Sequence, residues 1–282
     1  MAPVFRPIGM NIQAREGVFQ ISFKAGIDIG SVMAKAVIMN GGDILSHSVK
    51  PISGSFPQAA NRVLDEALEK AGLRYDQLEI IGATGLGASF VRGNHIDSTD
   101  VTCQSRGMNH LFPSVRIVIE VGDQSSRVIK VTNRGKVADC VVNDRCAAGS
   151  GRILQIIAKV LRTNINELGG LSAKSSRPVR FSTACSVFLE TEIISRVAEG
   201  TPRGDIIAGL HQAMASKILA MARKVKMEEA YGVTGGGAKD VGLVKILQET
   251  MGVELLVPDE PFITAAIGAA LVATEKQNAA VG

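Results

Sequence analysis

One segment of the chain occurs twice, and this repeat limits the possible fold more than any other feature of the sequence. Residues 24–42 resemble residues 117–133 at an offset of 92 residues. In each copy an apolar strand ends in a tight glycine turn and a second, alternating strand follows, which is the pattern of a β-hairpin. Two such hairpins predict a duplicated α/β architecture with two similar lobes.

The two copies also carry the same kinds of side chain at matching positions. An acid, a glycine and a base recur in the same order, pairing Asp28 with Glu120, Gly30 with Gly122 and Lys35 with Arg127. Because the matches include polar residues, they are more than a shared strand pattern. We therefore expect the two hairpins to contribute equivalent groups to one site.

Helical periodicity between the strands predicts a mixed α/β fold. Helices are expected over residues 57–71, 151–161, 186–199, 205–226, 239–251 and 262–276. Strands other than the first hairpin are expected over 79–83, 116–121, 127–132, 137–142, 179–182, 231–234 and 253–256. We divide the chain into an N-terminal arm (1–23), a first lobe (24–112) and a second lobe (113–257), with the C-terminal helix (258–282) packing back on the first lobe.

The composition excludes several classes of protein. Of 282 residues, 46% are hydrophobic and 21% charged, which is typical of a globular protein rather than a disordered or fibrous chain. Lysine and arginine (31) barely exceed aspartate and glutamate (27), and there are two tyrosines and no tryptophan. Nucleic acid is therefore not an expected partner, because its backbone requires a basic surface and its bases require aromatic platforms.

No membrane association is expected either. The longest uncharged, mostly apolar stretch, residues 261–274, is shorter than the roughly 20 residues that span a bilayer. The N-terminal residues show no apolar signal-peptide region, so we expect a cytoplasmic location. In that compartment cysteines are expected as thiols, metal ligands or packed side chains rather than disulfides, and the chain has Cys103, Cys140, Cys146 and Cys185.

Three glycine-rich turns, at residues 28–31, 120–125 and 234–239, each follow an apolar strand. Glycine allows backbone N–H groups to approach phosphate oxygens closely. An acidic residue just before such a turn can hold Mg²⁺ directly or through water. One such turn is typical of an ordinary tight turn, but three of them predict a nucleotide bound between two lobes.

The three turns resemble the two phosphate turns and the adenosine turn of the acetate kinase–sugar kinase–Hsp70–actin superfamily. A more specific resemblance, over about residues 25–275, rests on the motifs NDRCAAGSGR (143–152) and STACSVF (182–188). These motifs resemble the BadF/BadG/BcrA/BcrD ATPase family. That resemblance implies a two-lobed actin-like ATPase fold, with the nucleotide and a cofactor carried by the second lobe.

Members of that family are ATPases that drive electrons into enzymes acting on CoA thioesters. The resemblance implies electrons arriving from ferredoxin or flavodoxin and leaving to a reductase or dehydratase partner. The altered second turn and the N-terminal arm favour an ATPase subunit of benzoyl-CoA reductase. The alternatives are a homodimeric activator of a 2-hydroxyacyl-CoA dehydratase, a small-molecule kinase of the same fold, or a nucleotide sensor without turnover.

The resemblance further implies that Cys146 and Cys185 bind a [4Fe-4S] cluster. Such a cluster takes four cysteine ligands, so two per chain imply a second, homologous ATPase subunit in a hetero- or homodimer. Both residues precede expected helix starts, which stabilise thiolates. The alternatives are an intrachain site that includes Cys103 and Cys140, or buried cysteines without metal; for Cys140, in a strand pattern, a packed side chain is favoured.

The residues expected at an ATP/ADP and Mg²⁺ site follow from the same resemblance. The expected catalytic residues are Asp28, Glu120 and Gln124, and Mg²⁺ is expected at Asp28, near Glu120. Lys35 is either a phosphate contact or a surface lysine, and Lys239 either shapes the adenosine pocket or is solvated. The expected nucleotide-binding residues are Gly30, Ser31, Lys35, Gly122, Asp123, Gly235, Gly236, Gly237 and Lys239.

The second turn departs from the family pattern. Where the family often has Asp-Ile-Gly-Gly-Gln-Asp, this chain has Glu-Val-Gly-Asp-Gln-Ser at residues 120–125. Asp123 replaces a glycine, so its side chain must point away from the γ-phosphate or bind metal. Ser125 replaces an acid, whereas Gln124 remains and could orient the attacking water. A partner subunit with the fuller motif would tolerate this change.

Overall fold

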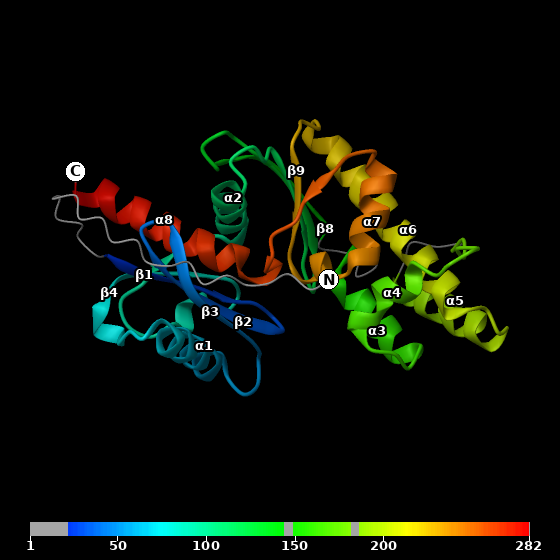
Figure 1. Cartoon of the computed structure of the whole chain (residues 1–282), viewed down its shortest axis with the longest axis horizontal. Coiled ribbons are helices and arrows are strands. Elements are labelled where there is room, and N and C mark those ends of the chain that lie inside the picture. Colours follow the sequence, from blue (N-terminus) through cyan, green and yellow to red (C-terminus); the bar gives the residue numbers. More distant parts are fainter. Residues whose placement is uncertain (1–21, 144–148, 182–185, 282) are drawn as a thin grey trace, which may run out of the picture.

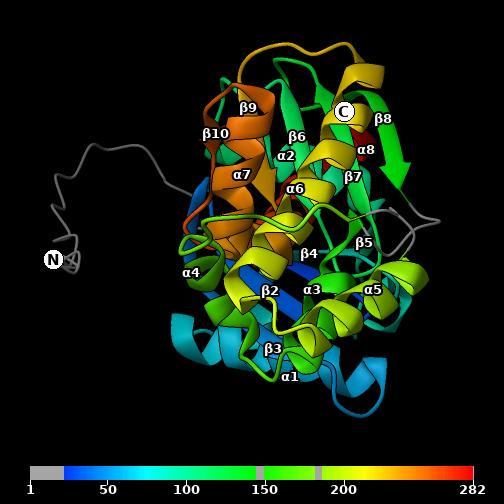
Figure 2. The same ribbon diagram turned by 90° about the vertical axis from the view of Figure 1, so that its right-hand side faces the viewer.

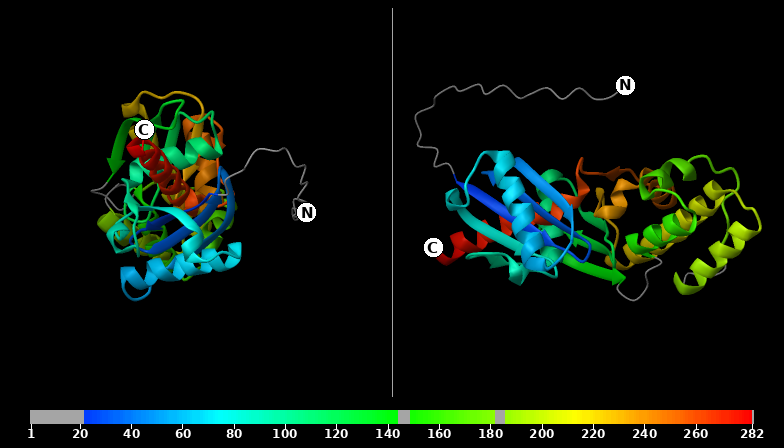
Figure 3. Two further views of the ribbon diagram at one scale, coloured as in Figure 1. Left: turned by 90° about the vertical axis from the view of Figure 1, so that its left-hand side faces the viewer. Right: turned by 90° about the horizontal axis from the view of Figure 1, so that it is seen from below.

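The computed structural model describes residues 22–143, 149–181 and 186–281 of the chain. Two five-stranded mixed sheets lie in two halves of the molecule, with helices α2 (Asp100–Leu111) and α8 (Thr264–Val281) between them (Figure 1). The outer helices of the second half and the C-terminal end of α8 lie at opposite ends of the molecule (Figure 3). The predicted N-terminal arm falls almost wholly outside the described residues.

The two sheets have the same strand order, which extends the repeat seen in the sequence. The first sheet runs β3-β2-β1-β4-β5 and the second, read in the same direction, runs β8-β7-β6-β9-β10. In each, an antiparallel three-stranded meander continues into parallel strands. The strands are β1 (Phe23–Ile29), β2 (Met33–Asn40), β3 (Asp43–Pro51), β4 (Leu78–Thr84), β5 (Ile96–Asp97), β6 (Ile117–Val121), β7 (Ser126–Val131), β8 (Val137–Asn143), β9 (Tyr231–Thr234) and β10 (Leu255–Leu256).

Helices cover both faces of each sheet. Helix α1 packs its apolar stripe on one face of the first sheet, and α8 covers the other. Helix α2 covers one face of the second sheet, and the helices from α3 to α7 cover the opposite face (Figure 2). These helices are α1 (Phe56–Ala71), α3 (Gly151–Val160), α4 (Leu168–Ser172), α5 (Ser186–Ala198), α6 (Arg203–Ala222) and α7 (Val241–Met251).

Helices α2 and α8 cross at contact distance because glycines lie where they meet. A Cβ atom on Gly268 would lie 1.8 Å from the carbonyl oxygen of Cys103, and one on Gly107 would lie 2.0 Å from that of Thr264. Helix α8 approaches β1 and β4 equally closely, at Gly26 and Gly82. The chain therefore passes between its two halves through tightly packed helices.

Most predicted elements are present, with one clear error. Residues 179–181 form no strand: Val179 runs beside α6, where its N–H donates to the carbonyl oxygen of Asp205 at 2.9 Å and its own carbonyl lies against Gly209. Helix α2 and strand β3 were not predicted because polar residues such as Gln104 and Ser48 lie on their buried faces. No described helix has the length and apolar character needed to cross a bilayer.

Candidate nucleotide site

A cleft with a cavity of about 630 Å³ opens between the two halves. Residues from all three glycine-rich turns line it, together with α2 and the start of α8. The sequence-predicted residues that the cleft brings together are Asp28, Gly30, Ser31, Lys35, Glu120, Gly122, Asp123, Gln124, Gly235, Gly236 and Gly237. Lys239 is not among the residues that line it.

The repeated acid and base of the two hairpins form two equivalent ion pairs in the cleft wall. Asp28 is paired with Lys35 across β1 and β2, and the Lys35 Nζ lies 2.8 Å from Asp28 Oδ2. Glu120 is paired with Arg127 across β6 and β7, at 2.9 Å. The Lys35 side chain is 12% exposed and lines the cleft, so the surface-lysine interpretation is wrong.

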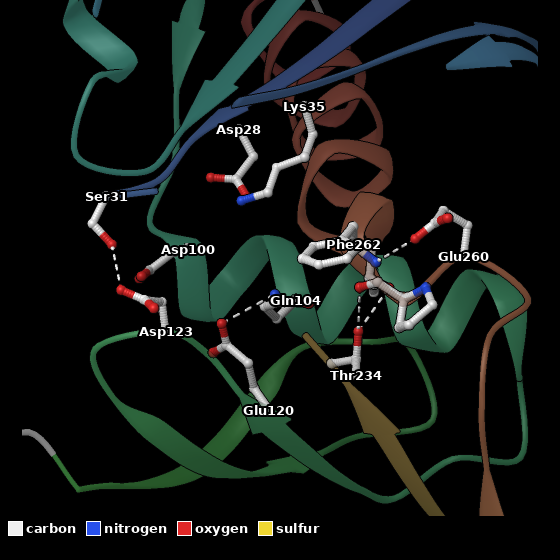
Figure 4. A network of polar contacts seen from close by, with 12 residues as sticks. Asp28, Ser31, Lys35, Asp100, Gln104, Glu120, Asp123, Thr234, Glu260 and Phe262 are labelled. Carbon is white, nitrogen blue, oxygen red and sulfur yellow. Dashed lines mark hydrogen bonds and ion pairs between the residues drawn. The ribbon is translucent and has the colours of Figure 1, made fainter. Parts of the chain in front are cut away.

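The first and second turns have the same hydrogen bonds and face one another. The Gly30 N–H donates to the carbonyl oxygen of Met33 at 3.1 Å, and at the equivalent position the Gly122 N–H donates to that of Ser125 at 3.0 Å. Ser31 Oγ reaches Asp123 Oδ2 at 3.5 Å, a contact between equivalent positions of the two hairpins (Figure 4). The two turns thus form opposite sides of one narrow gap.

Glu120 is partly buried beside groups on α2. Gln104 Nε2 donates to its Oε1 at 3.2 Å, and Arg127, which binds its Oε2, also pairs with Asp100 at 2.6 Å. Burial raises the pKa of the Glu120 carboxyl, and the positive charge of Arg127 opposes that shift. The site therefore holds a carboxylate whose negative charge is favoured by Arg127 and opposed by burial.

The second turn is bonded directly to the first turn of helix α3. The N–H of Gly151 donates to the carbonyl oxygen of Gly122 at 2.7 Å, and that of Arg152 donates to the carbonyl oxygen of Asp123 at 2.9 Å. Gln155 Nε2 donates to Asp123 Oδ1 at 2.8 Å. Asp123 is therefore held between α3 and Ser31, and any displacement of the second turn acts on α3.

The third turn is attached to the segment before α8. Gly235 has φ +82°, a conformation that favours glycine, and the Thr234 hydroxyl donates to the carbonyl oxygen of Pro261 at 3.0 Å. The Phe262 ring lines the cleft against Gly236. The Lys239 Nζ atom lies 2.8 Å from Glu260 Oε2 and 5.9 Å from the centroid of the Phe262 ring. It therefore supports the turn rather than lining the cleft.

Cys146 and Cys185 lie outside the described residues, so their expected role in a cluster stays a prediction. The other two cysteines lie among apolar side chains. Cys103 is fully buried, and burial raises the pKa of its thiol to about 12. Cys140 is half-buried against a small core, and burial raises its pKa as well. Cys103 packs against Ala265 and Ala269, and Cys140 packs against the core that contains Met108, so both lie as packed side chains, the interpretation favoured for Cys140.

In the described part of the chain, no group of three or more His, Cys, Asp or Glu side chains is arranged to hold a metal ion. A magnesium ion bound with a nucleotide does not need such a group, because one or two carboxylates, phosphate oxygens and water complete its shell. Asp28 has the oxygen ligands and the place in the cleft wall for that role.

Sequence reasoning missed Asp100, Gln104, Gln155 and Phe262 as cleft residues. Thr99 and Asp100 carried a usable signal: the Thr99 hydroxyl caps α2 by accepting from the Thr102 N–H at 3.3 Å, a pairing typical of a helix start. Gln104 and Gln155 had no such signal, because each reaches the cleft only through the placement of its helix.

Comparison with known proteins assigns the family. The model of the BadF/BadG/BcrA/BcrD ATPase family matches residues 25–273. The chain belongs to this family. The resemblance drawn from the two cysteine motifs is confirmed, and so is the two-lobed actin-like ATPase fold. A ROK family glucokinase from Streptomyces griseus has a similar fold, with a TM-score of 0.56 at 14% identity over 90% of this chain and 100% of the glucokinase. At that identity the likeness is one of fold alone.

Several relatives of this chain are activators of dehydratases. The chain is 33% identical to the 2-hydroxyisocaproyl-CoA dehydratase activator of Clostridioides difficile (90% and 96% covered), whose structure with bound ADPNP superimposes with a TM-score of 0.86 at 32% identity (92% and 97% covered). It is 34% identical to the (R)-2-hydroxyglutaryl-CoA dehydratase activating ATPase of Acidaminococcus fermentans (90% and 98%). A subunit of the benzoyl-CoA reductase of Thauera aromatica is 32% identical (89% and 93%).

Proposed function

We propose that this chain is an ATP-hydrolysing activator of a 2-hydroxyacyl-CoA dehydratase, which couples ATP turnover to electron transfer. The observation that carries the proposal is the cleft itself, in which two matched hairpins present equivalent turns and ion pairs to one another. The similarity to activators over nine tenths of the chain supports the choice of partner.

In this proposal ATP lies between the two halves. Its phosphates bind the backbone N–H groups of the Gly30 and Gly122 turns, since such turns form anion-binding concavities. Lys35 supplies a cation beside them. The adenosine lies against the Gly235–Gly237 turn, where the Phe262 ring offers an apolar face to the base.

The two carboxylates have different tasks because their surroundings differ. Asp28 holds Mg²⁺, which would neutralise charge on the β- and γ-phosphates. Glu120, held by Gln104 and Arg127, accepts a proton from the attacking water. Gln124, at the exposed mouth of the cleft, contacts the phosphates.

Coupling to electron transfer runs through α3. The backbone bonds from Gly151 and Arg152 to the second turn transmit a change at the γ-phosphate to the helix that follows residues 144–148. Cys146, in that segment, and Cys185 would hold a [4Fe-4S] cluster together with the same residues of a second subunit; the cluster supplies the one-electron chemistry. We propose ferredoxin or flavodoxin as the electron donor.

The expectation of a benzoyl-CoA reductase subunit needs correction, because relatives of the activator type fit better. Dehydratase activators cover the chain at 33–34% identity, against 32% for the reductase subunit. The similarity to that reductase subunit keeps its function as a second candidate. An activator purifies alone as a homodimer, whereas a reductase subunit co-purifies with a non-identical ATPase subunit.

The decisive experiment is anaerobic purification of the full chain, with iron, sulfide and oligomeric mass measured together. We expect a brown homodimer with four iron and four sulfide atoms per two chains, which hydrolyses ATP. Cys146→Ser should remove the colour and keep nucleotide binding, and Asp28→Ala should abolish phosphate release. A colourless monomer that transfers phosphate to a small acceptor would instead establish a kinase, and ATP binding without phosphate release a sensor.

A further inference from the structure

A second cavity, separate from the nucleotide cleft, lies among the outer helices of the second half. Its volume is about 910 Å³, and it is bounded by residues 176–180, the C-terminal end of α5 and the start of α6. Helix α5 lies toward the viewer in Figure 2. No described residue lines both this cavity and the cleft, so nucleotide binding gives the cavity no task. The charged residues that line it are Arg177, Arg180, Arg196, Glu199 and Asp205.

The segment that carries two of these arginines is fixed to α6. Asp205, only 7% exposed, accepts with Oδ1 from the Ser175 hydroxyl at 2.6 Å and from the Arg177 N–H at 3.0 Å. The Val179 N–H donates to the carbonyl oxygen of Asp205 at 2.9 Å. A Cβ atom on Gly209 would lie 2.1 Å from the Val179 carbonyl oxygen, so the segment lies directly on the helix. This backbone is held in place without a ligand, which lowers the cost of binding one.

Two of the three guanidinium groups in the cavity are available to an external anion. Arg196 is paired with Glu199 at 3.1 Å and with Glu192 at 3.8 Å. Within the described part of the chain, Arg177 and Arg180 form no ion pair through their side chains, and both residues are exposed. The remaining acid of the cavity is held by the hydrogen bonds of the segment. The free charge of the cavity is therefore positive.

We propose that this cavity docks carboxylate side chains on the surface of an acidic electron-donor protein, an inference that rests on the proposed electron-transfer function. Residues 176–180 and α5 lie on either side of residues 182–185 in the sequence, so a protein bound here is close along the chain to Cys185. A guanidinium group pairs with a carboxylate through two parallel hydrogen bonds. The exposed arginines would leave a free small anion in solvent, whereas sites for small ligands bury most of the ligand surface. A partner protein brings its own covering surface.

An open, charged contact suits a donor that binds briefly and leaves. Electron-transfer encounters have small interfaces, and complementary charge mainly raises the rate of association. Two unpaired arginines at an open rim supply such attraction. Salt should weaken it, because the Debye length falls from about 10 Å at 0.1 M ionic strength to about 3 Å at 1 M. The salt dependence of donor binding is therefore the signature to measure.

The test compares the double variant Arg177→Gln/Arg180→Gln with Arg134→Gln/Lys136→Gln in the full-length protein. The control pair lies in the turn between β7 and β8, is exposed, and removes the same number of positive charges from the same half. An acidic ferredoxin is the probe. The measurements are Kd for oxidised ferredoxin by calorimetry, the second-order rate constant for cluster reduction by reduced ferredoxin, and Tm. Binding and reduction are measured at about 0.05 M and about 0.5 M NaCl.

We expect the arginine variant to raise Kd and lower the rate constant at least about fivefold at low salt, with the difference vanishing at high salt, and the control to stay within about twofold. Equal values in the two variants overturn the inference, as does a wild type that does not bind ferredoxin. If the double variant does not fold, Arg180→Glu alone must show the same loss.

Two further outcomes separate this inference from the proposed function. Loss of dehydratase activation in the arginine variant, with ferredoxin binding intact, would overturn the inference, because the cavity would then belong to the electron acceptor. A protein without iron would refute the proposed function. Failure of the inference alone leaves a brown, ATP-hydrolysing protein whose two variants bind ferredoxin alike.

Discussion

Two cationic side chains in the cleft, Lys35 and Arg127, already form ion pairs with carboxylates of the protein. Lys35 lies 2.8 Å from Asp28, and Arg127 lies 2.9 Å from Glu120 and 2.6 Å from Asp100. A nucleotide must therefore compete for these cations or bring its own charge compensation. This explains, at the level of single residues, why the site proposed to bind a nucleotide contains several acids, and why Mg²⁺ belongs to the proposal.

Substitution of Lys35 tests its place at the phosphates. Lys35→Met leaves the Asp28 carboxylate unpaired beside the expected phosphate position, so we expect Kd for ATP to rise at least tenfold, measured by calorimetry. The control is Lys50→Met, on the neighbouring strand β3, where the lysine pairs with Glu66 at 2.9 Å outside the cleft. An equal loss of affinity in both variants would contradict the assignment.

Glu66 provides a pH-dependent contribution to stability that is independent of the site. Hydrogen bonds from Lys50 and Lys70 lower the pKa of this carboxyl from 4.5 to about 2. Its folded-state pKa is depressed, so the stabilisation is present above about pH 4.5 and is lost as the pH falls toward 2. Because solvent screens the ion pairs of Glu66 with Lys50 and Lys70, we expect Glu66→Gln to lower the free energy of unfolding by only about 0.5–1 kcal/mol at pH 7, measured in urea. The difference between variant and wild type should vanish near pH 2.

Among the elements, three helices are joined behind the third turn by a buried polar cluster. His211 of α6 places Nδ1 3.1 Å from the Ser172 hydroxyl of α4 and Nε2 3.2 Å from Asp240 Oδ2, although the latter two atoms are not aligned for a hydrogen bond. The other oxygen of Asp240 caps α7 by accepting from the N–H groups of Gly242 and Leu243, each at 3.0 Å. The cluster thus holds α4, α6 and α7 together beside the third turn.

Replacing His211 should therefore weaken the second half. His211→Leu removes the partner of Ser172 and leaves Asp240 Oδ2 in an apolar setting, for which we expect a loss of about 1–3 kcal/mol in the free energy of unfolding. His47→Ala, at an exposed histidine of β3, should change it by less than about 0.5 kcal/mol. If His211→Leu is neutral in urea unfolding, the cluster contributes nothing to stability.

For the whole molecule, the crossing of α2 and α8 joins the two halves. Gly268→Ala would put a methyl group 1.8 Å from the Cys103 carbonyl oxygen, so the helices must separate. We expect a loss of about 1–3 kcal/mol or more in stability by thermal unfolding, and weaker nucleotide binding because the turns no longer face each other. Gly170→Ala in α4 should be neutral or slightly stabilising, because an added Cβ there would have no described atom within 4 Å other than those of its own helical segment.

The repeat could be predicted from the sequence because a strand–turn–strand hairpin is formed by residues close together in the chain. Its register places Asp28 opposite Lys35 and Glu120 opposite Arg127 with no help from distant residues. The three glycine turns were recognisable for the same reason, since a tight turn between strands selects its residues by backbone conformation. Amphipathic helices such as α1 and α3 followed from the spacing of their apolar residues.

Only the tertiary structure decided which helices reach the cleft. Asp100 and Gln104 belong to a helix that buries polar residues, so the helix has no clear hydrophobic periodicity in the sequence. Residues 179–181 have the sequence pattern of a strand, but in the structure they run beside α6 instead. The contact of Ser31 with Asp123 depends on the angle between two halves that the α2–α8 crossing sets. Local patterns therefore determined the hairpins and turns, whereas the partners of Glu120 followed from packing, because they come together only when both sheets enclose the same pair of helices.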